Sequence, residues 1–320
     1  MPQLSEHDWI RRLIGRLSMR DRRVLVGPGD DCAVLRIGGR TVLVTTDALV
    51  AGVHFKRGWL SPRALGERAY RVNASDVAAM GGRPIAAVVA MEVPRGVSAA
   101  TLDGIVGGFV AAGRRHGAAL VGGNLARGPA LAITVTLLGL AAGRVVTRAG
   151  ARPGDVVVVT GALGATGTAV RDRRGGRPTA LPRLPDRVAA GIALARVASA
   201  MIDVSDGLVQ DLGHVARASG VAIRLETARI PVAASCRRRL GAQATAFALA
   251  AGEDYELALT VPVRRLAVLD RIARKLGCRL TRIGVVTGGR PAVTVVDSDG
   301  AALPLRRAGF DHLAGPARRR

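Results

Sequence analysis

Short apolar runs of strand length alternate with longer segments of helical spacing, and no other feature of the sequence restricts the fold as much. The runs at 41–46 and 156–161 are rich in Val and Thr, which is typical of buried strands. Helical patterns occupy about 61–80 and 98–116. Because helices and strands bury their apolar faces against one another, this order predicts an α/β (α+β) fold with helices packed on sheets.

A break in the alternation divides the chain near its middle. Residues 148–155 read RAGARPGD, and this mixture of glycine, proline and charge favours a loop. A strand pattern begins again directly afterwards. Since 320 residues suit two domains of ordinary size, we predict two mixed α/β domains, 1–150 and 151–320.

Glycine, serine and proline predict where several elements begin and end. The pair Gly38-Gly39 separates two apolar runs and predicts a hairpin. Ser61 precedes a proline and predicts the start of a helix. A further helix is expected over about 6–18, and the Arg/Gly/Pro-rich residues 171–187 predict an exposed loop.

The chain is strongly basic, with 47 Lys and Arg against 24 Asp and Glu and a formal net charge of +23. Lys56 and Lys275 are the only lysines, and the arginines are spread along the whole sequence. Aromatic residues make up 2%, so the chain offers few platforms on which bases could stack. We therefore expect weak, salt-sensitive attraction to polyanions and no specific nucleic-acid partner.

Cysteine usage and hydropathy indicate the compartment. Cys32, Cys236 and Cys278 are odd in number and far apart, so they form neither a disulfide framework nor a CxxC metal pair. No apolar run has the length of a membrane span, and the N-terminus lacks the pattern of a signal peptide. We expect a soluble cytoplasmic protein without a membrane partner.

The acidic residues are few but concentrated beside Gly, Ser and Thr. A single Asp in such a setting is commonly a turn residue or a helix cap. Five such segments in one chain favour a shared site for a hard cation, which prefers oxygen ligands. Ten of the 24 acids lie in these segments: Asp30, Asp31, Asp47, Asp76, Asp203, Asp206, Asp211, Glu253, Asp254 and Glu256.

Two of these segments combine carboxylates with hydroxyl groups. Thr45 and Thr46 precede Asp47 at the end of a predicted strand, where they suit Mg²⁺. Residues 203–206 lie between a predicted strand and a predicted helix whose start would attract phosphate oxygens. Asp76 lies within a predicted helix, from which its carboxylate could bridge two metal ions.

Other phosphate-binding and catalytic signatures are absent. The glycine-rich turn 161–167 follows a strand and could cradle phosphate, but it lacks the Walker lysine pattern. No GxGxxG, GxSxG, HExxH or CxxCH occurs. The residues therefore indicate a Mg²⁺-dependent enzyme that handles polyphosphate and transfers the phosphoryl group directly.

These segments resemble motifs of the thiamine-monophosphate kinase family, which belongs to the aminoimidazole ribonucleotide synthetase-like superfamily. The reactive cysteines of the selenophosphate synthetase and hydrogenase-maturation branches are missing. In chain order the resembling motifs are GDDCAVL, TTDALVAGVHF, NASDVAAMGG, TRAGARPGD, IDVSDGLVQDLGHV, GEDYEL and GFDH.

The resemblance implies a fold, a reaction and partners. The fold would have an N-terminal mixed sheet that forms the interface of a homodimer and a C-terminal α/β domain. The reaction would convert thiamine monophosphate and ATP into thiamine diphosphate and ADP by direct transfer, assisted by several Mg²⁺ ions.

The resemblance also implies roles for individual residues. Asp47 and Asp206 would be the catalytic residues. ATP would contact Gly123, Arg148 and Ser205, and the substrate would contact His54, Glu253 and Phe310. The implied metal ligands are Asp31, Thr45, Thr46, Asp47, Asp76, Asn124, Asp203 and Asp206.

Asn124 departs from the family pattern, which has an aspartate after the Gly-Gly pair. An amide oxygen in place of a carboxylate weakens the attraction for a metal ion. Two alternatives therefore stay open beside the kinase: a related ATP-using enzyme with another acceptor, and a catalytically weak paralogue. A non-catalytic binding protein is a third.

Overall fold

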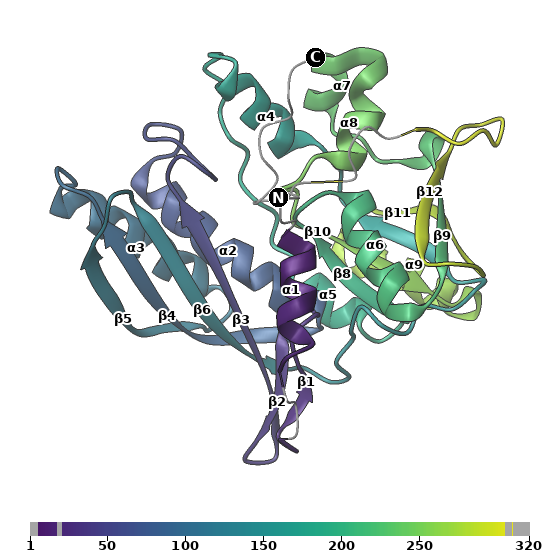
Figure 1. Ribbon diagram of the computed structural model, residues 1–320, viewed down its shortest axis with the longest axis horizontal. Coiled ribbons are helices and arrows are strands. Elements are labelled where there is room, and N and C mark those ends of the chain that lie inside the picture. The colour runs from purple at the N-terminus through teal and green to yellow at the C-terminus, as the bar shows by residue number, and fades with distance from the viewer. Residues whose placement is uncertain (1–5, 18–20, 305–308, 310–320) are drawn as a thin grey trace.

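Two six-stranded sheets with their helices make up the computed structural model, which describes residues 6–17, 21–304 and 309 (Figure 1). The first sheet has the order β1-β2-β3-β6-β4-β5, and only the β4–β5 pairing is parallel. This confirms the expectation of a mixed sheet in the N-terminal half. Its strands are β1 (Val24–Val26), β2 (Ala33–Ile37), β3 (Arg40–Val50), β4 (Gly82–Val93), β5 (Ala119–Arg127) and β6 (Ala132–Ala141).

Helices α2 (Pro62–Ala79) and α3 (Ala99–Arg114) cover one face of this sheet. Ser61 caps α2 as expected, because its hydroxyl accepts the backbone N–H of Ala64 at 3.2 Å. The two helices approach each other closely at Gly66 and Gly108. A Cβ at either position would overlap backbone atoms of the opposite helix, so glycine is required there.

The second sheet has the order β12-β9-β11-β7-β10-β8, and only β9 and β12 are parallel. Its strands are β7 (Val156–Thr160), β8 (Ala200–Val204), β9 (Ala222–Glu226), β10 (Glu256–Val261), β11 (Leu280–Thr287) and β12 (Ala292–Val296). The helices of this half are α4 (Ala165–Arg174), α5 (Val188–Leu194), α6 (Leu208–Ser219), α7 (Ala234–Leu240), α8 (Ala244–Ala250) and α9 (Leu266–Leu276).

Helix α2 lies between the two sheets and joins their cores. It packs against β3, β4 and β6 of the first sheet and against α5 and β8 of the second half. Tyr70 and Met80 are fully buried in a core that also contains Leu194 and Met201 from the second half. This placement carries the polar residues of α2 to the junction of the two halves.

Three local expectations need correction. Helix α1 (Glu6–Ile14) is shorter than the predicted 6–18. Residues 171–174 belong to α4, and the remaining loop is not simply exposed, because Leu184 is buried in the core. Arg187 also anchors this loop, with two hydrogen bonds of 2.6 and 2.7 Å to the carboxylate of Glu256.

Within the described residues, none of the helices has the length and apolar character needed to cross a membrane. The cysteines Cys32, Cys236 and Cys278 are free, as their spacing indicated.

Candidate active site

A cavity of about 410 Å³ lies where α2 and β3 of the first half meet β8, α4 and the start of α6 in the second half. The residues predicted from separate motifs meet at this cavity. Those that line it are Asp31, Thr45, Thr46, Asp47, His54, Asp76, Arg148, Asp203, Ser205, Asp206 and Glu253.

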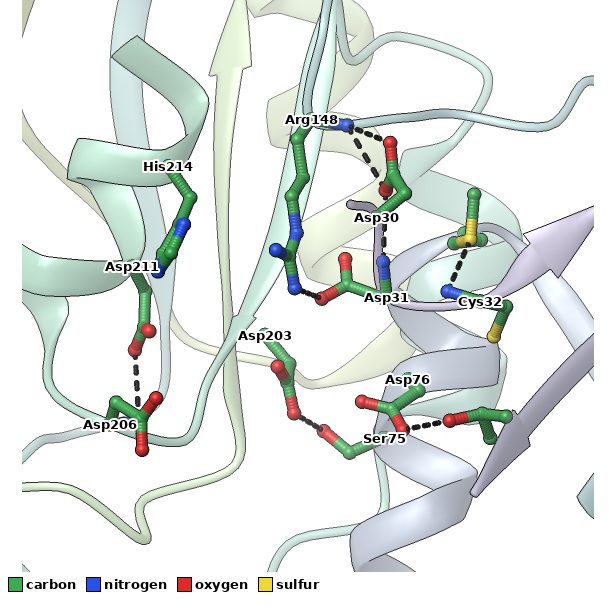
Figure 2. A network of polar contacts seen from close by, with 12 residues as sticks. Asp30, Asp31, Cys32, Ser75, Asp76, Arg148, Asp203, Asp206, Asp211 and His214 are labelled. Carbon is green, nitrogen blue, oxygen red and sulfur yellow. Dashed lines mark hydrogen bonds and ion pairs between the residues drawn. The ribbon is translucent and has the colours of Figure 1, made fainter. Parts of the chain in front are cut away.

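Three carboxylates converge at the base of the cavity. Asp31 precedes β2, Asp76 lies on α2, and Asp203 lies on β8. Each offers one oxygen, and these three oxygens lie within 4.8 Å of one another (Figure 2). Carboxylates from three distant segments would repel one another unless a cation joined them.

Neighbouring hydroxyl groups orient two of these carboxylates. Thr45 donates to Oδ2 of Asp76 at 2.6 Å, and Ser75 donates to Oδ2 of Asp203 at 2.7 Å. Each hydrogen bond occupies one oxygen and leaves the other for a ligand. The hydroxyl of Thr46 instead donates to the Val135 carbonyl on β6 at 3.0 Å.

Burial dominates the electrostatics of this cluster. It raises the pKa of Asp76 and Asp203 well above the usual value, and neighbouring carboxylates raise both further. Burial and Asp31 together raise the pKa of Asp30 to about 6. Oxygen ligands that carry uncompensated negative charge fit a divalent cation such as Mg²⁺.

Arg148 contributes positive charge beside the acids. Its Nη2 donates to Oδ1 of Asp31 at 2.7 Å, and its backbone N–H donates to Oδ2 of Asp30 at 3.0 Å (Figure 2). Burial lowers the pKa of Arg148, but Asp31 outweighs this effect and raises it. Among the described residues, Nε of Arg148 and Oδ2 of Asp31 are buried without a hydrogen-bond partner. These two atoms can receive an anionic ligand and a cation, respectively.

The turn at 205–207 presents Ser205 and Asp206 to the cavity. The side chain of Asp211 fixes this turn, because its Oδ2 accepts the backbone N–H groups of Asp206 at 3.2 Å and Gly207 at 3.0 Å. Gln210 donates to Oδ2 of Asp206 at 3.3 Å. Asp211 therefore acts as a cap here, and Asp206 as a residue of the cavity wall.

Residues 252–255 form the part of the cavity wall next to this turn, in a constrained conformation. Glu253 and Tyr255 have φ values of 66° and 50°, which are rare for residues with a side chain. Their backbone N–H groups donate to the carbonyls of Ser205 at 2.6 Å and Val204 at 2.8 Å. Non-glycine residues in this region are often found at functional sites, where the surroundings hold them.

The glycine-rich turn before α4 does not present its backbone for phosphate. The carboxylate of Asp254 accepts the N–H of Gly164 at 2.8 and 3.0 Å. Asp254 thereby caps the helix. The turn contributes to the site only through the next helical turn, where Gly167 lines the cavity.

Two predicted residues, Gly123 and Asn124, are not brought to the cavity of this chain. Gly123 and Asn124 lie on β5, the edge strand, and Asn124 is exposed beside Ala90 of β4. Three strand spacings separate β5 from β3, or about 14 Å. Phe310 lies outside the described residues.

Three residues that were not predicted from the sequence support or line the site. The side chain of Asn73 accepts the N–H of Asp47 at 3.0 Å, and Tyr255 lines the cavity. Arg68 donates to Oε2 of Glu253 at 2.7 Å. Asn73 and Tyr255 stand inside the NASD and GEDYEL motifs, whereas Arg68 is one of many arginines without a distinguishing neighbour.

Comparisons with known proteins agree on the family. Two family models match the chain: the AIR synthase related protein N-terminal domain over residues 29–141 and the corresponding C-terminal domain over residues 152–296. The thiamine-monophosphate kinase of Salmonella typhimurium is 36% identical over 98% of this chain and 99% of its own length. The Mycobacterium tuberculosis enzyme of the same name is 39% identical over 80% of each chain.

Solved structures of thiamine-monophosphate kinases also match the chain. AaThiL complexed with AMPPCP and TMP has a TM-score of 0.84 and 30% identity, covering 98% of each chain. Thiamine-monophosphate kinase from Stenotrophomonas maltophilia has a TM-score of 0.77 and 35% identity, covering 95% of this chain and 98% of its own. Hydrogenase maturation protein HypE, at 21% identity, shares the fold.

Proposed function

The chain belongs to the thiamine-monophosphate kinase family, and we propose that it transfers a phosphoryl group from ATP directly to thiamine monophosphate, giving thiamine diphosphate and ADP. The observation that carries this proposal is the convergence of Asp31, Asp76 and Asp203 in one cavity beside Arg148. Phosphoryl transfer depends on positioning and on neutralised charge, and this cavity offers both.

We propose Mg²⁺ as the resident metal, because the converging ligands are oxygen atoms only. When bound, the metal ions neutralise phosphate charge. Asp31, Asp76 and Asp203 would hold these ions from one side, with Thr45 fixing the orientation of Asp76. The remaining proposed ligands are Thr46, Asp47 and Asp206.

Arg148 and Ser205 are proposed to bind the phosphates of ATP. The Arg148 guanidinium has Nε free of protein partners within the described part of the chain, so its Nε–H can donate to a phosphate oxygen while Nη2 stays on Asp31. His54, Glu253 and Phe310 are proposed to bind the acceptor. His54 accepts the N–H of Val50 through Nδ1 at 3.0 Å, which directs its other ring nitrogen away from that backbone.

We propose that the protein is a homodimer and that its interface covers the outer face of the first sheet. This outer face, opposite α2 and α3, carries Val88, Ala90, Thr136 and Asn124, and Val88 is 38% exposed. Exposed apolar side chains on an uncovered sheet favour packing against a second sheet. Because Asn124 and Gly123 lie far from their own cavity, the partner copy would receive them.

The free cysteines support a reducing compartment, and we propose that the reaction takes place in the cytoplasm.

A test of the proposed roles follows ADP release in the presence of ATP, Mg²⁺ and thiamine monophosphate. Asp47→Ala and Asp206→Ala should lower the rate at least about 100-fold, because each removes a charge that holds the phosphates in place. Asp103→Ala is the matched control, since Asp103 is an exposed acid on α3. Wild-type rates in either site variant would contradict these roles.

A further inference from the structure

An arginine from the first half of the molecule forms an ion pair with Glu253, a proposed substrate-binding acid from the second half. Arg68 on α2 and Glu253, before β10, form an ion pair with 2.7 Å between Nη2 and Oε2. The side chain of Arg68 is only 6% exposed, whereas that of Glu253 is 24% exposed and lines the cavity. Arg68 itself does not line this cavity.

Glu253 depends on this contact more than an ordinary surface acid would. Its backbone is fixed in the left-handed region by the hydrogen bond from its N–H to the Ser205 carbonyl. The backbone thus limits where the side chain can point. Without a paired cation, the carboxylate would be directed toward a cavity that already holds Asp47 and Asp203.

Arg68 likewise depends on Glu253, because its buried guanidinium is largely shielded from water. A guanidinium that is almost fully buried must keep a partner, because an unpaired buried charge is costly. Glu253 is the partner that the structure gives it. The contact also joins the two halves of the molecule. Helix α2 carries both Arg68 and the proposed metal ligand Asp76.

We propose that Arg68 is a positioning residue for substrate binding: its guanidinium holds Oε2 of Glu253, which leaves Oε1 to accept an N–H of the acceptor. This inference rests on the proposed function. The acceptor class that fits is a cationic heterocycle that carries an amino group, because a carboxylate attracts the charge and accepts the hydrogen bond.

The test compares KM values for thiamine monophosphate and ATP in four single variants and one double variant. Arg68→Met removes the guanidinium, Arg68→Lys keeps a charge, and Glu253→Gln removes the acid. Arg71→Met is the matched control, because Arg71 lies on the same helix, is equally buried at 6% exposure and pairs with Glu67 instead.

Arg68→Met should raise the KM for thiamine monophosphate about 10-fold and leave the KM for ATP within about 2-fold. Arg68→Lys should recover part of the loss, and Arg71→Met should leave both constants unchanged. In the Glu253→Gln background, Arg68→Met should change the KM for thiamine monophosphate less than about 2-fold, because the two residues act through one contact.

Two results would overturn the inference. One is an equal rise in both KM values, which would indicate a general loss of structure. The other is a full Arg68→Met effect in the Glu253→Gln background. Formation of thiamine diphosphate by the wild-type protein in the same assay reports on the proposed function separately, so the two can fail independently.

Discussion

Burial and neighbouring acids disfavour the ionised form of the Asp76 carboxyl group. Burial, then Asp47 and Asp203, raise its pKa, and the only described contact that opposes this is the Thr45 hydroxyl. A carboxyl group with a raised pKa in the folded state destabilises the fold when ionised, and this effect disappears as the pH falls through that pKa. The ionised acids of the site therefore lower the stability of the metal-free fold, and the same charges attract a metal ion.

Asp76→Asn should therefore stabilise the metal-free protein by roughly 1–2 kcal/mol at neutral pH, because it removes the charge and retains an acceptor for Thr45. It should also abolish the gain in melting temperature that Mg²⁺ gives the wild type. Thermal unfolding with a chelator and with excess Mg²⁺ checks both parts. A lower melting temperature in chelator would count against this interpretation.

At position 124 this chain has the neutral Asn124, where the family pattern has a charged aspartate. Asn124→Asp should increase activity or lower the Mg²⁺ concentration required for half-maximal rate, because a carboxylate attracts the ion more strongly than an amide. Steady-state rates over a Mg²⁺ titration measure this. If neither quantity changes, Asn124 is not near the metal, and a different acceptor becomes the better explanation for the substitution.

At the residue scale, the sequence predicted the acids of the cavity but not the arginine that pairs with Glu253. Acidic residues are few in this chain and gather beside Gly, Ser and Thr, so Asp31, Asp76 and Asp203 stood out. Arg68 did not, since the sequence is rich in arginine and its function arises from a contact with Glu253, 185 positions away. Long-range pairing of this kind has no local signal.

At the element scale, the crossing of α2 and α3 depends on small residues. Gly108→Ala should destabilise the protein by roughly 1–3 kcal/mol, because the added Cβ would overlap the backbone of Arg63 and force the helices apart. Denaturant unfolding measures the change.

Gly107→Ala is the control for this crossing, since a Cβ at Gly107 meets nothing within 4 Å. In a helix interior this substitution should stabilise the protein by up to about 1 kcal/mol. Equal effects of the two substitutions would mean that the close approach of α2 and α3 does not determine the stability.

Sequence periodicity predicted strands β3 and β7 and helices α2 and α3 but missed α7 and α8. Both are seven residues long and lie in a segment rich in Ala and Arg, where no apolar stripe distinguishes a helix. The loop after α4 was predicted to be exposed because of its composition. Its ion pairs with Glu67 and Glu256 come from other elements and hold it in place.

At the scale of the whole molecule, the proposed dimer depends on the outer face of the first sheet. Val88→Arg should convert the dimer to a monomer, because a charge would be buried at the interface. Val268→Arg is the control, as Val268 is 36% exposed on α9, away from that face. Sedimentation velocity distinguishes the two states. A dimer that survives Val88→Arg would require another interface.

The proposed reaction transfers a phosphoryl group from ATP to thiamine monophosphate in this cavity. The most direct measurement incubates the wild-type protein with γ-labelled ATP, Mg²⁺ and thiamine monophosphate and separates the products by chromatography. We expect the label to appear in thiamine diphosphate and no label to be transferred when thiamine monophosphate is omitted. Label that stays in ATP, or that appears only as inorganic phosphate, would contradict it.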